Sequence, residues 1–275
     1  MKTILMAGLV AASLHAPARH AHGGAPVDAP AGDWSHAPRL LPAGGGRGEV
    51  MLRLADLQAT ELTVFAPGAT GGTPVRRVPV AAGRAGITPA APMLGNYHWV
   101  QARDTTGGTI RVATTAVYFA NPGPAPTALL AESRSELEIV PTPLPREHAH
   151  YREGERWRFV VRWQGRPLAG QPVTMETSRG SRARAISAAD GQVVFIFPRD
   201  VDPGDRDAGG PGRPGAVFVL WTERRLDGVH YLTSFTGRYS PEPGRTRSLP
   251  WGTGFALFGM VLALPLLRRR ETRHD

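Results

Sequence analysis

The sequence contains no cysteine, and Lys2 is the single lysine among its 32 basic residues. The absence of cysteine excludes disulfide bonds, thiolate metal ligands and a cysteine nucleophile, so packing alone must hold the fold together. Hydrophobic stripes of helical period are also scarce, whereas glycine and proline number 33 and 26 in 275 residues. This balance is typical of short strands joined by turns.

A basic stripe with interleaved aromatic residues is missing as well. The formal net charge is +9, but the arginines are spread along the whole chain. Nucleic-acid surfaces need clustered positive charge, so we expect no nucleic-acid partner. Because alanine, glycine and proline are abundant, we interpret the preference for arginine over lysine as codon bias of a GC-rich genome.

Motifs of common hydrolases are absent too. The sequence has no Gly-x-Ser-x-Gly elbow and no His-Glu-x-x-His pair. Glu136 and Glu138 share one strand parity and could mimic an acid/base pair. We interpret them as the solvated side of a strand, and we predict that the protein is not an enzyme.

Residues 156–197 carry the clearest strand signal. Aromatic and aliphatic residues occupy one parity from Trp157 through Phe159 to Trp163, and arginines occupy most of the other. Period-two alternation predicts a strand with one buried face. The aromatic residues could form a sugar-stacking platform, but we assign them to a sandwich core. Asp190-Gly191 then predicts a tight turn.

The pattern along the chain predicts an all-β fold, with two Ig-like β-sandwich domains plus one C-terminal transmembrane helix. The first domain spans 49–122 and the second spans 136–240, with a linker at 123–135 that contains a short helix near 127–132. The expected strands are 49–54, 61–65, 74–80, 96–103 and 109–120, then 137–140, 156–163, 173–177, 192–197, 216–222 and 229–236.

The two ends of the chain predict where the protein is located in the cell. Residues 1–18 resemble a secretory signal peptide, with Lys2 before a short apolar run. Residues 19–48, rich in histidine, glycine and proline, are expected to form a flexible tether. After a linker at 241–250, residues 251–267 carry no charge and would span about 25 Å as a transmembrane helix. A buried or hairpin-forming tail is the alternative.

The last eight residues, 268–275, begin with three arginines and would form a basic cytoplasmic tail. These segments together predict a bacterial cell-membrane protein of single-pass topology with an extracytoplasmic, periplasmic ectodomain.

Three stretches carry a family resemblance, namely 137–141 (LEIVP), 165–173 (GRPLAGQPV) and 189–193 (ADGQV). They are similar to the NikM-like periplasmic family, whose domains are Ig-like or transthyretin-like and are associated with nickel uptake. The resemblance implies a β-sandwich and a link to metal transport. The tail after Pro241-Glu242-Pro243 also resembles an exosortase sorting signal, which implies sorting and cleavage of the helix. A retained anchor is the alternative, since Gly244 to Pro250, with Arg245 and Arg247, separate the tripeptide from the helix.

Histidine pairs are the candidate metal ligands. His148 and His150 lie two residues apart, so in an extended segment both rings point to the same side. His20 and His22 could chelate an ion together with a new amino terminus. Imidazole suits Ni, Co, Cu or Zn. The alternative is that both pairs are polar loop residues. His98 is expected to face solvent or a domain interface.

We therefore predict a membrane-anchored extracytoplasmic β-sandwich binding protein. Its first hypothetical role is to capture a divalent transition metal for a membrane transporter. The alternative is a structural or adhesive Ig-like module that binds an envelope protein or polymer.

Overall fold

The protein is built from β-strands with one short helix, α1 (Thr127–Ala131), between its two halves. The computed structural model describes residues 34–46, 48–68, 73–89, 93–120, 123, 125–145, 150–202, 215–242 and 260. The strands of the first half are β1 (Arg39–Gly46), β2 (Glu49–Ala55), β3 (Glu61–Phe65), β4 (Val75–Pro79), β5 (Arg84–Ile87), β6 (Tyr97–Thr106) and β7 (Thr109–Tyr118). Those of the second half are β8 (Leu137–Pro141), β9 (Tyr151–Arg152), β10 (Arg156–Trp163), β11 (Arg166–Pro167), β12 (Pro172–Thr177), β13 (Arg182–Ile186), β14 (Gln192–Ile196), β15 (Ala216–Leu226) and β16 (Val229–Ser240).

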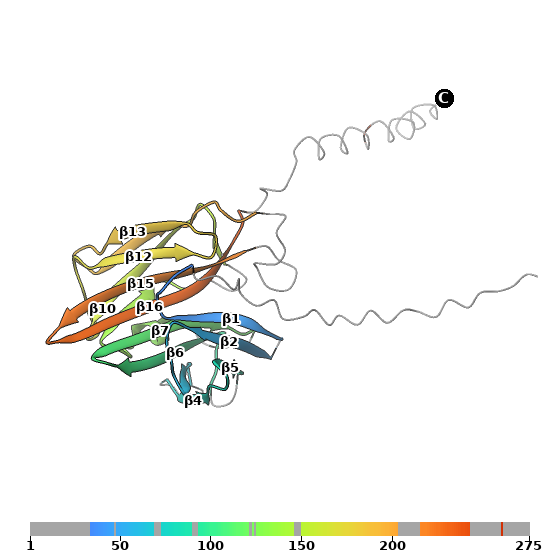
Figure 1. Cartoon of the computed structure of the whole chain (residues 1–275). Coiled ribbons are helices and arrows are strands. Elements are labelled where there is room, and N and C mark those ends of the chain that lie inside the picture. Colours follow the sequence, from blue (N-terminus) through green and yellow to red (C-terminus); the bar gives the residue numbers. More distant parts are fainter. Residues whose placement is uncertain are drawn as a thin grey trace, which may run out of the picture.

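One long sheet runs through the molecule in the order β13-β12-β15-β16-β7-β6-β3-β4. Figure 1 labels its strands from β13 to β6 in this order. The halves meet where β16 pairs in parallel with β7, from His230 opposite Thr109 to Thr236 opposite Thr115. Two smaller sheets complete the fold, β1-β2-β5 and a second one in which β10 pairs with β8, β11 and β14. The two predicted domains therefore share a continuous hydrogen-bonded ladder.

The smaller sheets cover opposite faces of the long sheet. On β6, Tyr97 and Trp99 belong to a core shared with β8, β10 and β14. The residues that follow on the other parity, Val100 and Ala102, belong to a second core shared with β1, β2 and β5. Because neighbouring side chains on a strand point to opposite faces, the long sheet is the middle of three layers.

Aromatic rings fill the first core. Phe159 and Phe218 are fully buried, and the rings of Phe197 and Phe218 lie 4.7 Å apart. Trp157 and Trp163 pack against the same core from its margins. Each buried ring contributes roughly 1.5–3 kcal/mol through removal from water. The prediction that the aromatics of β10 form a core and not an exposed platform is confirmed.

Period-two alternation located most of the strands. Every strand expected from 49 to 240 is present, with ends that differ by a few residues, and α1 confirms the short helix in the linker. The all-β, sandwich-like architecture is thus confirmed. β5 and β13 were not predicted, because their sequences RAGI and RARAI carry almost no large apolar residues.

The predicted tether ends earlier than expected, because β1 lies within it. Leu40 and Leu41 are buried, and β1 pairs with β2 from Arg39 opposite Ala55 to Gly46 opposite Glu49. The glycine run belongs to an irregularity of this hairpin. A Cβ on Gly45, whose φ is +120°, would lie 2.3 Å from the Glu49 carbonyl oxygen, so the close approach of the chain requires glycine.

The other terminal predictions fall outside the described residues. This applies to the signal peptide at 1–18, to the start of the tether, to the basic tail at 268–275 and to the predicted span 251–267, of which Met260 alone is described. Among the described residues, no helix has the length and hydrophobicity that a membrane crossing needs.

Candidate functional site

Of the predicted metal ligands, the structure describes only His150. It is exposed directly before β9, and His148, His20 and His22 lie outside the described residues. Within the described ranges, no group of three or more histidine and carboxylate side chains is arranged to hold a metal ion. The metal site therefore stays a prediction.

Two residues are more buried than the sequence indicated, namely His98, expected at solvent or at a domain interface, and Glu138, expected on a solvated strand face. His98 is completely buried, with its ring 4.9 Å from that of Phe119. Its side chain points into the core beneath β1-β2-β5, whose position depends on long-range packing that strand parity does not reveal. Burial lowers the pKa of His98, and the positive charge of Arg76 lowers it further. Glu138 is only 5% exposed, because the linker folds over it.

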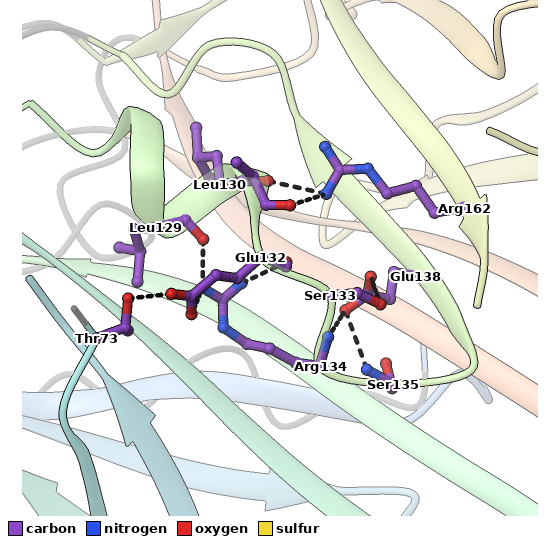
Figure 2. A network of polar contacts seen from close by, with 10 residues as sticks. Thr73, Leu129, Leu130, Glu132, Ser133, Arg134, Ser135, Glu138 and Arg162 are labelled. Atoms are coloured by element: carbon purple, nitrogen blue, oxygen red, sulfur yellow. Dashed lines mark hydrogen bonds and ion pairs between the residues drawn. The ribbon is translucent and has the colours of Figure 1, made fainter. Parts of the chain in front are cut away.

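That linker is held by a dense polar network, shown in Figure 2. The Arg134 guanidinium donates to the carbonyl oxygens of Leu129 and Glu132 and lies 4.9 Å above the ring of Phe65. Its side chain is 2% exposed, and burial lowers its pKa. Arg134 thus ties the end of α1 to the first half of the chain.

Glu138 completes the network from the second half. Its carboxylate accepts hydrogen bonds from the backbone N–H groups of Arg134 and Ser135, at 2.7 and 3.1 Å. Arg162 donates at 2.9 Å to the carbonyl oxygen of Leu130 (Figure 2). The carboxylates of this region are therefore engaged in fixing the linker, which argues against Glu136 and Glu138 as an acid/base pair. Glu136 instead receives two hydrogen bonds from Arg103, at 2.7 and 2.8 Å.

An open groove of about 690 Å³ lies on the other side of the second half, over β12, β13 and β15. The groove forms because a short side chain lies between two long ones. In the strand register, Thr174 lies between Arg184 of β13 and Trp221 of β15. The lining residues are Gln171, Pro172, Thr174, Arg182, Ala183, Arg184, Trp221 and Glu223. We call this set the outer groove.

Hydrogen bonds fix the ends of the outer groove. The Gln171 amide donates to Thr222 Oγ1 at 2.7 Å and to the Glu223 carbonyl oxygen at 2.8 Å. Beyond Trp221 the next residue in register is Ser234, which is fully buried and donates to the carbonyl oxygen of Pro38. The N-terminal segment therefore closes the face at β16 and leaves it open over β12, β13 and β15.

Sequence reasoning missed the outer groove. Its residues come from three strands that adjoin only in the folded sheet, and β13 was not expected. The one feature of the sequence that could have indicated the groove is Trp221, which lies on the strand parity opposite Phe218 and Leu220. Tryptophan is enriched at interfaces, so a tryptophan on the outer face of a strand marks a candidate binding surface.

No protein-family model and no curated protein matches the chain. The NikM-like resemblance therefore stays a prediction. Among solved structures, a 1.5-MDa bacterial ice-binding adhesin involved in host cell surface retention matches with a TM-score of 0.26 and 13% identity, over 71% of this chain and 58% of that one. A Ca²⁺-stabilised adhesin with which an Antarctic bacterium binds ice gives 0.26 and 10%, over 71% and 44%.

A two-domain fibronectin type-III segment from chicken tenascin gives a TM-score of 0.21 and 8% identity, over 73% of this chain and 97% of that one. The chain thus spans 58% and 44% of the two adhesin structures. Superpositions this loose say nothing about ligand or partner.

Proposed function

We propose that the chain is an adhesive β-sandwich module, which holds an envelope polymer or protein in the outer groove and acts by binding without catalysis. The observation that carries this proposal is an open groove on a rigid sheet face, with an aromatic side chain on one side and hydrogen-bonding groups around it. Concave surfaces with a few fixed polar groups are the usual form of ligand sites.

The rigidity of the sheet supports this role. β12 is hydrogen-bonded on both sides, to β13 and to β15, so the side chains of the groove stand on a fixed backbone. Gln171 is held by two hydrogen bonds before any ligand arrives. Preorganised groups lose little conformational entropy on binding.

The location proposed for this module follows from the targeting and membrane segments predicted at the two ends of the chain. A signal peptide at 1–18 and a single span at 251–267 would place the groove outside the bacterial cell membrane, where envelope polymers lie. Metal capture through His148 and His150 remains the competing hypothesis, and a chelator separates the two.

A retention assay tests the proposal. The purified full-length chain is incubated with washed, insoluble envelope material, and bound protein is measured after sedimentation. We expect wild-type protein to be retained equally with and without EDTA. Trp221→Ala and the groove-filling Thr174→Tyr should each lose most of the retention.

The control is Ile196→Ala, which removes a side chain that is 56% exposed on the opposite small sheet. It should be retained like wild type, and circular dichroism verifies the fold of each variant. Equal retention of folded Thr174→Tyr and wild-type protein would contradict the proposal, and loss of retention in EDTA would favour metal capture.

A further inference from the structure

The charged groups of the outer groove are unequally engaged. Arg182 forms an ion pair with Glu176 at 2.6 Å, and Glu223 contacts His230 at 2.8 Å. Arg184 is exposed and has no ion-pair or hydrogen-bond partner within the described part of the chain. The groove therefore presents one unengaged guanidinium, and a guanidinium binds carboxylates through two parallel hydrogen bonds.

The groove is also polarised across its width. The row Arg184, Thr174, Trp221 crosses three neighbouring strands, which places its ends roughly 10 Å apart. The cationic group lies at the β13 end and the aromatic ring at the β15 end. Glu223, two residues beyond Trp221 on the same face, adds a carboxylate that accepts hydrogen bonds from hydroxyl groups.

We propose that the outer groove binds an acidic polysaccharide, with a uronate carboxylate on Arg184, the apolar face of a sugar ring on Trp221 and ring hydroxyl groups on Glu223 and Gln171. This assignment rests on the proposed adhesive function and names its ligand class. The anionic group and the hydroxyl groups of such a polymer match the polarity of the groove.

An acidic peptide fits the groove less well. Peptides that bind to sheets usually add a strand at a free edge. The backbone at the floor of the groove is β12, which is already paired on both sides, and a strand added at the edge strand β13 would lie beside the groove and not in it. Half of the lining residues carry planar polar groups, and Trp221 is the one aromatic side chain among them. Such a surface offers no deep apolar pocket for the side chains of a peptide.

Isothermal titration of the full-length chain tests the ligand class. The probes are oligogalacturonate and alginate oligomers, each compared with its methyl ester, which has the same rings without the charge. We expect at least one free acid to bind about tenfold or more tightly than its ester, and added salt to reduce this difference.

Variants assign the contacts. Arg184→Gln should bring the affinity for the free acid down to that for the ester, and Trp221→Ala should weaken both by about tenfold or more. Arg158→Gln is the matched control, because Arg158 is an exposed arginine on β10, in a different sheet, with no side-chain partner in the described structure. It should bind both probes like wild type.

The outcomes separate the two proposals. Equal affinity for acid and ester, no binding of any uronate, or tighter binding of a polyglutamate peptide would each overturn the saccharide assignment. If the protein is still retained on envelope material through Trp221 and Thr174, the adhesive function stands. If retention also fails, both proposals are wrong.

Discussion

Arg134 and His98 are both polar and both buried, but they accommodate burial in opposite ways. The Nη atoms of Arg134 donate to carbonyl oxygens of the linker and its guanidinium lies over the faces of Phe65 and Trp99, while its Nε has no hydrogen-bond partner among the described residues. His98 has no side-chain hydrogen-bond partner among the described residues and packs against Phe119. A charge is therefore supported at Arg134, whereas at His98 the neutral ring is favoured.

The stability of the protein should depend on the protonation of His98. Because its pKa is lowered in the folded state, the unfolded chain takes up this proton first as the pH falls. The unfolding free energy should then drop below about pH 6.5, by up to about 1.4 kcal/mol per pH unit, until the folded pKa is reached.

Urea unfolding from pH 8 to pH 5 measures this effect, and His98→Leu should flatten the profile below pH 6.5. His36→Gln, at an exposed histidine, is the control and should keep the wild-type slope. Identical slopes for His98→Leu and wild type would refute the prediction.

Arg134→Ala should destabilise the fold by about 3 kcal/mol, because it leaves the part-buried carbonyl oxygen of Leu129 unpaired and removes the side chain between Phe65 and the linker. Arg134→Lys should recover little, since an ammonium group lacks the planar fork. Chemical denaturation gives the values. The exposed Arg156→Ala should stay within about 0.5 kcal/mol of wild type, and a similarly small effect of Arg134→Ala would show that the network is dispensable.

At the scale of elements, alternation and turn residues were enough to locate the strands that have one apolar face. They failed for β1, because Pro42 and the glycines resemble a linker, and for β13, whose arginines and alanines give no apolar contrast. The outer groove could not be predicted because it depends on which strands become neighbours. Pairing between β12 and β15 links residues more than forty positions apart, such as Thr174 and Trp221.

β1 should be essential to the N-terminal core, and not part of a tether. Leu40 is fully buried in the core beneath β1-β2-β5, so Leu40→Ala should reduce the unfolding free energy by about 2–5 kcal/mol. Thermal and urea unfolding report the change. Val75→Ala removes an apolar side chain that is 57% exposed and should have little effect. An effect of Leu40→Ala as small as that of Val75→Ala would restore the tether interpretation.

At the scale of the whole molecule, the parallel pairing of β7 with β16 makes one sheet from two halves. The linker network adds a second connection, from Glu136 to Arg103 and from Arg134 to Phe65. Each half therefore contributes surface and hydrogen bonds on which the other depends. Two sandwiches joined only by a flexible linker would lack this dependence.

We expect a single cooperative unfolding transition for the described region in calorimetry and in urea. Ala113→Pro, placed in β7 opposite Ser234, should remove ladder hydrogen bonds and lower the stability of both cores together. Intrinsic tryptophan fluorescence and far-ultraviolet circular dichroism should give coincident curves. Two separated transitions in the wild-type protein would contradict this expectation.

The position of β16 has a mechanical consequence. It is the last strand of the described residues before the predicted membrane anchor, and it lies inside the long sheet. It pairs with β15 from Val229 to Tyr239 on one side and with β7 from His230 to Thr236 on the other. Tension between a ligand held outside and the anchor would pull β16 along its own axis. Both rows of hydrogen bonds would then be loaded together in shear. A strand at the edge of a sheet, in contrast, could be separated one hydrogen bond at a time.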